Sequence, residues 1–93
     1  MVVASLTLEL QIPGSQSLKD KRQAIRSLRD RIRAKFNVSV AEVDNQDLWQ
    51  RATIGVAVVS SDGKLAHETL DKVRRLAEQD FRLSILDTYI ETW

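Results

Sequence analysis

Apolar and polar residues alternate at the start of the chain. From Val2 to Ile12 the even positions are apolar, and from Ser5 onward the odd positions are polar. This period of two predicts a strand with one buried face and one open face. Pro13 and Gly14 then turn the chain, because both residues favour turns over regular structure.

A helical period follows. Ser17 is expected to cap a helix that has Asp20 at its third position and runs to about Lys35. At 100° per residue its apolar residues fall within roughly 80°, the spacing of a helix that buries one stripe. They are Leu18, Ile25, Leu28, Ile32 and Phe36. Asn37 is expected to end the helix, because Asn tolerates the left-handed cap conformation.

The second half of the chain repeats these patterns in a different order. We expect a short strand over residues 38–43, followed by a turn over residues 44–47. The next strand covers residues 48–60 and buries its even positions, beginning with Leu48. Ser61 or Asp62 is expected to cap a second helix. Its predicted buried residues are Leu65, Leu70, Val73, Leu76 and Ala77. Residues 83–92 form a last strand.

The element order β-α-β-β-α-β predicts the fold class. Right-handed crossovers and amphipathic elements place both helices on one face of a four-stranded antiparallel sheet. This is an α+β, ferredoxin-like sandwich, and residues 1–93 make one domain. The other face of the sheet stays open and is therefore a place to look for function.

Composition excludes several classes of site. The chain has no cysteine, which excludes disulfides, thiolate metal sites and thiol catalysis. The first strand lacks the basic start of a signal peptide. The longest apolar run, residues 54–59, is too short to cross a membrane. We therefore expect a cytoplasmic protein with no membrane partner.

Charge is distributed unevenly, although the net charge is only +1. Residues 19–36 carry eight bases and two acids, whereas residues 37–93 carry six bases and ten acids. A protein with one basic side and an acidic remainder favours oriented binding to a polyanion. Docking onto the acidic part of another copy is an alternative.

Five of the bases form a second stripe beside the apolar one on the first helix. This basic stripe consists of Lys19, Arg22, Arg26, Arg29 and Arg33. Like charges at this spacing repel, so folding alone does not favour them. Arginine suits bidentate phosphate contacts, and Lys21, Arg31 and Lys35 are expected to add to the field. A solvated helix face is the other interpretation.

Residues for catalysis are scarce. His67 is the only histidine and is expected on a helix surface. The segment 60–64 lacks the leading glycine and the final Ser or Thr of a phosphate loop, so it is interpreted as a helix cap. Glu42, Asp44 and Asp47 are expected to make turn hydrogen bonds. We expect neither an enzyme nor a bound cofactor or metal.

Aromatic residues indicate a second candidate surface. Trp49, Arg51, Tyr89 and Trp93 are expected to point from the open face of the sheet. Aromatics on such a face stack bases in RNA-recognition modules, but the first strand offers none. Trp, Tyr and Arg also dominate subunit interfaces, so a homodimer through this face is the favoured interpretation.

Three stretches carry a resemblance to a known family: SLKDKR (17–22), FNVSVAEVDNQDLWQRA (36–52) and IGVAVVSSD (54–62). They resemble the YlxP-like family of small bacterial proteins, a domain of unknown function. The resemblance implies a ferredoxin-like fold and no catalytic residues. Genes of this family tend to lie beside those for translation initiation and ribosome maturation, which implies an association with ribosomal RNA or a ribosomal particle. The matching positions are Ser17, Lys19, Lys21, Arg22, Asn37, Asp47, Trp49, Gln50 and Arg51.

Two main hypotheses result. The first is a non-enzymatic RNA-associated or ribosome-associated protein that binds phosphates through the first helix. The alternative is a homodimeric protein-interaction module that uses the open sheet face, with the basic helix docking an acidic partner. An enzyme acting on a phosphorylated small molecule is a third.

Overall fold

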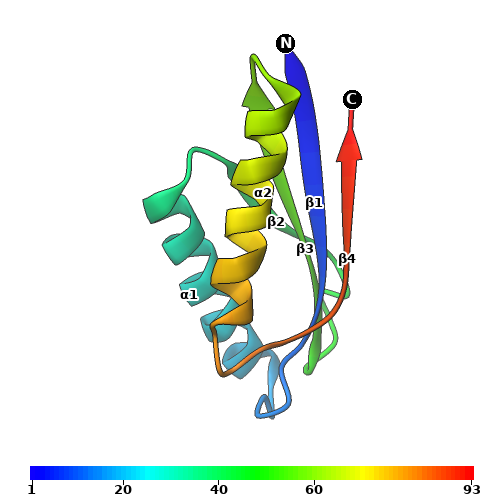
Figure 1. Ribbon diagram of the computed structural model, residues 1–93. Helices are drawn as coiled ribbons and strands as arrows, with labels where there is room; N and C mark the ends of the chain where they lie inside the picture. Colours follow the sequence, from blue (N-terminus) through cyan, green and yellow to red (C-terminus); the bar gives the residue numbers. More distant parts are fainter.

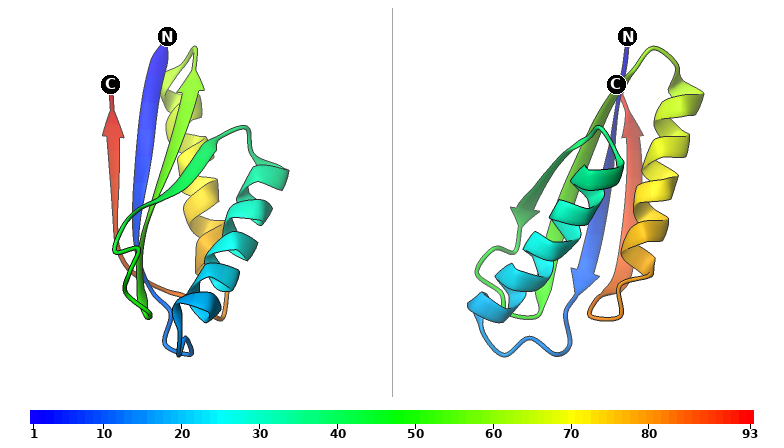
Figure 2. Two further views of the ribbon diagram at one scale, coloured as in Figure 1. Left: turned by 180° about the vertical axis from the view of Figure 1, so that it is seen from behind. Right: turned by 90° about the vertical axis from the view of Figure 1, so that its left-hand side faces the viewer.

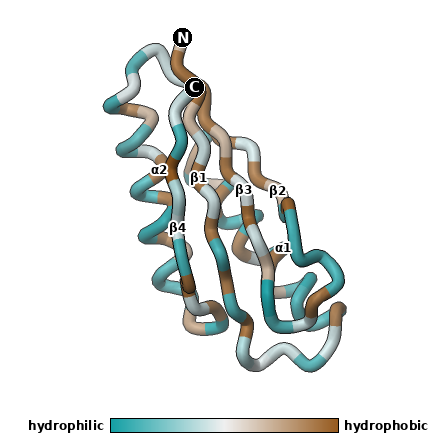
Figure 3. The backbone as a smooth tube through the Cα atoms, turned by 90° about the vertical axis from the view of Figure 1, so that its right-hand side faces the viewer, coloured by the Kyte–Doolittle hydropathy of each residue, from teal (hydrophilic) through white to brown (hydrophobic).

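Four strands and two helices make two layers in the computed structural model, which describes residues 1–93 (Figure 1). The elements in chain order are β1 (Val2–Gln11), α1 (Leu18–Lys35), β2 (Ser39–Asp44), β3 (Arg51–Ser60), α2 (Gly63–Glu78) and β4 (Ser84–Thr92). The sheet order is β2-β3-β1-β4, and all neighbours are antiparallel. Both helices cover one face, and Figure 3 looks onto the open one. The ferredoxin-like prediction is confirmed.

The core lies between the sheet and the helices. The even residues of β1 from Ala4 to Leu10 are fully buried and pair with the even residues of β3, for example Leu6 with Val56 and Leu8 with Ile54. Opposite residues of an antiparallel pair share a face, so these side chains meet the helices as one layer. The predicted alternation therefore sets the register of the two central strands.

Helix α1 begins as predicted but ends differently. The Ser17 hydroxyl accepts a hydrogen bond from the Asp20 amide at 3.0 Å, and the Asp20 carboxylate accepts one from the Gln16 amide. The expected left-handed cap at Asn37 is wrong, because the chain leaves the helix at Phe36 in an extended conformation. Phe36 packs partly buried against the core, which takes the chain directly towards β2.

Strand β3 begins at Arg51, so the predicted start at Leu48 is wrong. Leu48 is 45% exposed and belongs to the β2–β3 loop. The carbonyl oxygens of Asn45 and Gln46 accept hydrogen bonds from a side chain of α1 and so take no part in strand pairing. The backbone is therefore diverted from the sheet until Arg51.

Helix α2 is capped by Asp62, whose carboxylate accepts a hydrogen bond from the Lys64 amide at 2.8 Å. The helix buries the predicted stripe except at Leu65, which is 53% exposed. Leu65 lies about a quarter of a turn from the centre of that stripe. Ala66 is buried in its place.

Each edge strand contains a bulge. Val43 is the extra residue in β2, and Leu86 is the extra residue in β4. The second bulge sets the phase of β4 so that Tyr89 lies opposite Thr7. Tyr89 therefore shares the open face with the odd residues of β1.

A buried carboxylate holds the α2–β4 connection against α1. The Asp80 side chain is 2% exposed and accepts hydrogen bonds from the Arg82 side chain at 2.8 and 3.1 Å and from Arg31 of α1. Arg82 also donates to the Ser27 hydroxyl at 2.9 Å. The Arg82 hydrogen bond, with the charges of both arginines, lowers the pKa of Asp80 below its ordinary value.

Replacing Asp80 with Asn should reduce the free energy of unfolding by about 2 kcal/mol near neutral pH, because hydrogen bonds to a charged group are lost. A lowered carboxylate pKa contributes stability that is present above the ordinary value of about 4 and is lost as the pH falls through the folded-state value. The difference between wild type and variant should therefore shrink below about pH 4 in urea unfolding.

The Asp71→Asn variant, which removes helix-surface ion pairs with Arg74 and Arg75, is the matched control and should change little. If the Asp80→Asn variant were as stable as wild type near neutral pH, the Asp80 carboxylate would not hold the α2–β4 connection against α1.

Candidate anion-binding site

The basic stripe lies along the side of α1 that faces the edge strand β2. Arg33 donates to the Val40 carbonyl of β2 at 3.2 Å, and Arg22, Arg26 and Arg29 line a hollow with Glu42 of β2. The right-hand view of Figure 2 shows α1 beside β2, with α2 on the other side of α1. These contacts place the four arginines of the stripe on the flank of α1 beside β2, and Lys19 is exposed in the first turn of the helix.

No carboxylate of the chain pairs with the stripe. Six other basic residues form ion pairs, namely Lys21, Arg31, Arg51, Arg74, Arg75 and Arg82. None of the five stripe residues does, although Asp20 and Asp30 belong to the same helix. The stripe is therefore a line of five unmatched charges at the surface of one helix.

The hollow in the middle of the stripe has a volume of about 130 Å³. Its lining includes three arginines and Glu42, and the charge of Glu42 is matched by Lys21. The Arg29 Nε atom is buried and has no hydrogen-bond partner. Buried polar atoms are normally satisfied, and an anionic oxygen is a strong acceptor for a guanidinium group. The Glu42 Oε2 atom in the same lining is also buried without a hydrogen-bond partner, although it lies 2.9 Å from the Lys21 ammonium. The hollow therefore has an excess of positive charge around one carboxylate whose charge Lys21 matches.

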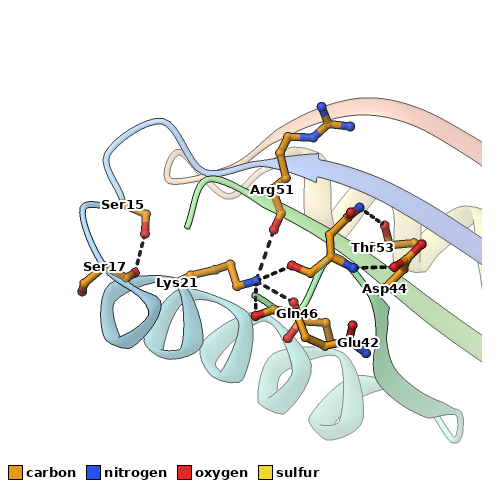
Figure 4. A network of polar contacts seen from close by, with 9 residues as sticks. Ser15, Ser17, Lys21, Glu42, Asp44, Gln46, Arg51 and Thr53 are labelled. Atoms are coloured by element: carbon orange, nitrogen blue, oxygen red, sulfur yellow. Dashed lines mark hydrogen bonds and ion pairs between the residues drawn. The ribbon is translucent and has the colours of Figure 1, made fainter. Parts of the chain in front are cut away.

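Lys21 does not belong to this accessible surface. Its side chain is fully buried, and its ammonium donates to the carbonyl oxygens of Asn45 at 2.8 Å, Gln46 at 3.0 Å and Arg51 at 3.3 Å (Figure 4). The three donors of an ammonium are thereby used, and Glu42 at 2.9 Å supplies the opposite charge. The expectation that Lys21 adds to the external field is wrong.

The other two additional bases differ from each other. Arg31 lies on the opposite flank of α1, where it pairs with Asp80. Its charge is therefore matched, and the expected contribution to the stripe is wrong for this residue. Lys35 is exposed in the last turn of α1 and forms no ion pair.

Residues 45–50 form a loop, here called the Trp49 loop, that is held at both ends. Besides the Lys21 contacts, the Asn45 side chain donates to the Thr53 hydroxyl at 2.9 Å. The Gln50 side chain donates to the Ser15 carbonyl at 3.0 Å, and the Gln50 carbonyl accepts from the Ile12 amide at 2.8 Å. Asn45 adopts the left-handed conformation with φ of 60°.

Trp49 is 56% exposed on this loop, so its predicted position within β3 is wrong. The other three predicted interface residues follow the sheet. Arg51 lies opposite Gln11, Tyr89 lies opposite Thr7, and the Trp93 amide donates to the Val3 carbonyl at 2.7 Å. Arg51 and Trp93 are thus about 26 Å apart along the strand direction. The four residues do not form one cluster.

The open face around Tyr89 is acidic. The Tyr89 hydroxyl donates to the Asp87 carboxylate at 2.9 Å, and Glu91 lies on the same face of β4. The hydrogen bond to Asp87, with the charges of Asp87 and Glu9, raises the pKa of Tyr89 above its ordinary value. Arg51 is the nearby cation, 3.9 Å from Glu9. This face is therefore unsuited to phosphate.

The other residues considered for catalysis, phosphate binding or metal binding make hydrogen bonds within the protein. The His67 Nε2 atom lies 2.8 Å from the Thr92 hydroxyl oxygen, and the Asp44 carboxylate accepts from the Asn45 amide. The Ser60 hydroxyl accepts from the Asp62 amide at the start of α2. No group of three His, Cys, Asp or Glu side chains is placed to hold a metal ion. Neither helix has the length and apolar character to span a membrane.

Sequence reasoning missed the role of Lys21, although a signal was present. At 100° per residue Lys21 falls inside the sector that contains Ile25, Leu28 and Ile32. A lysine in the centre of an apolar stripe either interrupts the stripe or is buried with a partner. Its partners lie 21 to 30 residues further along the chain, and no local pattern identifies them.

Replacing Lys21 with Met should lower the free energy of unfolding by about 3 kcal/mol, because Glu42 and three carbonyls lose their buried partner. Amide hydrogen exchange of the Trp49 loop should accelerate in the same variant. Met keeps the length of the side chain and a good helix propensity.

Lys19→Met is the matched control, since Lys19 is exposed and unpaired one half-turn away. Equal stabilities of the two variants would show that the buried ammonium does not hold the loop. Adding Glu42→Gln to Lys21→Met should restore part of the loss, because the unpaired carboxylate is removed.

Two comparisons with known proteins concern the sequence of the chain. Residues 3–90 match a family described as a protein of unknown function, DUF503. The uncharacterised protein YlxP of Bacillus subtilis is 42% identical over 65 residues, which are 70% of this chain and 71% of that protein.

Solved structures share the architecture at low identity. A de novo designed protein with ferredoxin fold, LFR1 1, has a TM-score of 0.57 at 9% identity, covering 100% of this chain and 84% of that one. LarC2, the C-terminal domain of a cyclometallase involved in the synthesis of the NPN cofactor of lactate racemase, has a TM-score of 0.50 at 8% identity, covering 100% of this chain and 55% of that one. The family match and the similarity to YlxP together show that the chain belongs to the YlxP-like DUF503 family.

Proposed function

We propose that this protein is a non-enzymatic, cytoplasmic RNA-binding protein that holds the phosphate backbone along the basic stripe of α1. The observation that carries the proposal is the absence of intramolecular ion pairs in the stripe. Five cations share one helix flank, and none of them pairs with a carboxylate of the chain. Phosphate oxygens supply the missing negative charge and accept hydrogen bonds from guanidinium groups.

The shape of the surface favours a polymer over a small anion. The stripe extends over fifteen residues of α1, from Lys19 to Arg33, or about 21 Å along the helix axis. Several phosphates in a row match that length better than one phosphorylated molecule does. RNA, and in particular a ribosomal particle, is proposed because the family resemblance implies neighbouring genes for translation initiation and ribosome maturation. Phosphate contacts position a protein without reading sequence, so little sequence preference is expected.

Neutralising three residues of the stripe should weaken this binding and reduce its dependence on salt. With five phosphate contacts, the affinity of the wild type for structured RNA should fall with a log–log slope of roughly −4. In the triple variant Arg22→Gln, Arg26→Gln and Arg29→Gln the slope should be about −2. Filter binding or fluorescence anisotropy over a series of salt concentrations measures both values.

The matched control is Lys72→Gln, Arg74→Gln and Arg75→Gln on α2. It removes the same charge from a helix whose arginines pair with Asp71 and Glu78. RNA binding should be nearly unchanged in this control. Equal losses in the two triple variants, or a wild-type slope near zero, would contradict binding through α1.

Self-association through the open sheet face is a second candidate function. The observation that favours it is a row of exposed apolar residues on this face, with Val43 and Val59 more than half exposed and Trp93 at the end of β4. Gly55 and Ala57 lie between them. Apolar patches with aromatic residues are typical of the centres of interfaces.

A dimer of this kind should dissociate when a charge is placed in the patch. Light scattering at tens of micromolar should give a dimer for the wild type and a monomer for Val59→Asp. Leu65→Asp, at an exposed position of α2, is the control and should stay dimeric. A monomeric wild type at these concentrations would exclude the second candidate.

A further inference from the structure

The Trp49 loop presents an aromatic side chain on a rigid support. Trp49 and Leu48 are 56% and 45% exposed, whereas the backbone beside them is fixed by the Lys21 ammonium and by Gln50. Burying an ammonium is unfavourable unless it gains strong contacts. The fold thus uses a costly interaction to fix a loop whose two large apolar residues remain in solvent, which is typical of a binding surface.

The loop lies at the N-terminal end of the basic stripe. Its Asn45 and Gln46 carbonyls contact Lys21, and Lys19 and Arg22 of the stripe are within two residues of Lys21 on α1. The right-hand view of Figure 2 shows the β2–β3 connection beside the start of α1. A chain that follows the stripe towards this end of the helix therefore reaches the Trp49 loop.

Charge decides which part of a nucleic acid can meet the loop. Asp44 and Asp47 flank the exposed segment, so the loop repels phosphates, while the arginines of α1 attract them. The uncharged bases are the part that can approach Trp49. We infer that Trp49 stacks against an unpaired RNA base at the start of α1 while the basic stripe holds the adjoining phosphates. This inference rests on the proposed RNA binding.

The other exposed aromatic residues are less suitable. Tyr89 is hydrogen-bonded to Asp87 and lies near Glu9 and Glu91, which repel a phosphate backbone. Trp93 lies beside Val3, at the end of the sheet away from Arg51 and the Trp49 loop. Phe81 is 96% exposed but belongs to the α2–β4 connection, where it lines a hollow with Asp20 and Ala24 on the flank of α1 away from the stripe. Trp49 is the exposed aromatic residue on the loop that Lys21 holds against the first turns of α1.

The inference specifies the class of RNA. A base inside a duplex is stacked on both faces, so only single strands, loops, bulges and ends can offer a face to Trp49. Stacking of one base on an aromatic side chain contributes enough to change affinity by about tenfold or more. The protein should therefore prefer unpaired RNA over a duplex at equal phosphate number.

The test uses the Trp93→Phe variant, in which Trp49 is the only tryptophan. Three ligands are titrated: a short unpaired RNA, the same strand within a duplex, and an abasic chain of equal length. The unpaired RNA should quench Trp49 fluorescence strongly, and the abasic chain should bind without quenching. Trp49→Ala should weaken binding of unpaired RNA about tenfold and leave binding of the abasic chain unchanged.

Two further variants separate stacking from folding. Trp49→Phe should retain most of the affinity, because a phenyl ring also stacks, and Leu48→Ala should bind as the parent does. Circular dichroism checks that each exposed-loop variant is folded. If Trp49→Ala bound unpaired RNA with the affinity of the parent, and this RNA did not quench Trp49 fluorescence in the parent, base stacking on Trp49 would be overturned. Phosphate binding by the basic stripe would still stand. Failure of all three ligands to bind would overturn the proposed function and the inference with it.

Discussion

The buried ammonium of Lys21 is the interaction on which the arrangement of this protein depends. It joins the first turns of α1 to the end of β2, the Trp49 loop and the first residue of β3 through three carbonyls and Glu42. A charge in the interior persists only when its donors and its charge are all satisfied, which is the case here. The position of α1 against the edge strand follows from this contact.

The same contact divides the positive charge of α1 into two groups. Lys21 and Arg31 are matched by Glu42 and Asp80 and serve the fold. The five residues of the basic stripe have no such partners. Because Glu42 is already matched by Lys21, it does not neutralise the arginines around the hollow in which it lies. The excess charge is therefore external and is available to a polyanion.

The sequence was sufficient for the architecture and for the line of cations, because both depend on periodicity. Alternation located β1 and β3, and the 3.6-residue period located the buried and basic flanks of α1. It was not sufficient for the Trp49 loop. The start of β3 depends on carbonyls that turn towards Lys21, which lies 24 to 30 residues earlier in the chain. The alternation of apolar and polar residues carries no sign of this contact, so the predicted strand included Leu48 and Trp49. The predicted strand therefore began three residues too early and included Trp49, which belongs to the loop.

We propose that RNA contacts the protein through the unmatched guanidinium groups of α1. Nuclear magnetic resonance of arginine Nε–Hε groups during titration with RNA can show this contact, because each side chain gives its own signal. The signals of Arg22, Arg26 and Arg29 should shift together, while those of Arg74 and Arg82, which are paired within the chain, should remain in place. Shifts confined to Arg51 on the open sheet face, with the α1 signals unchanged, would contradict the proposal.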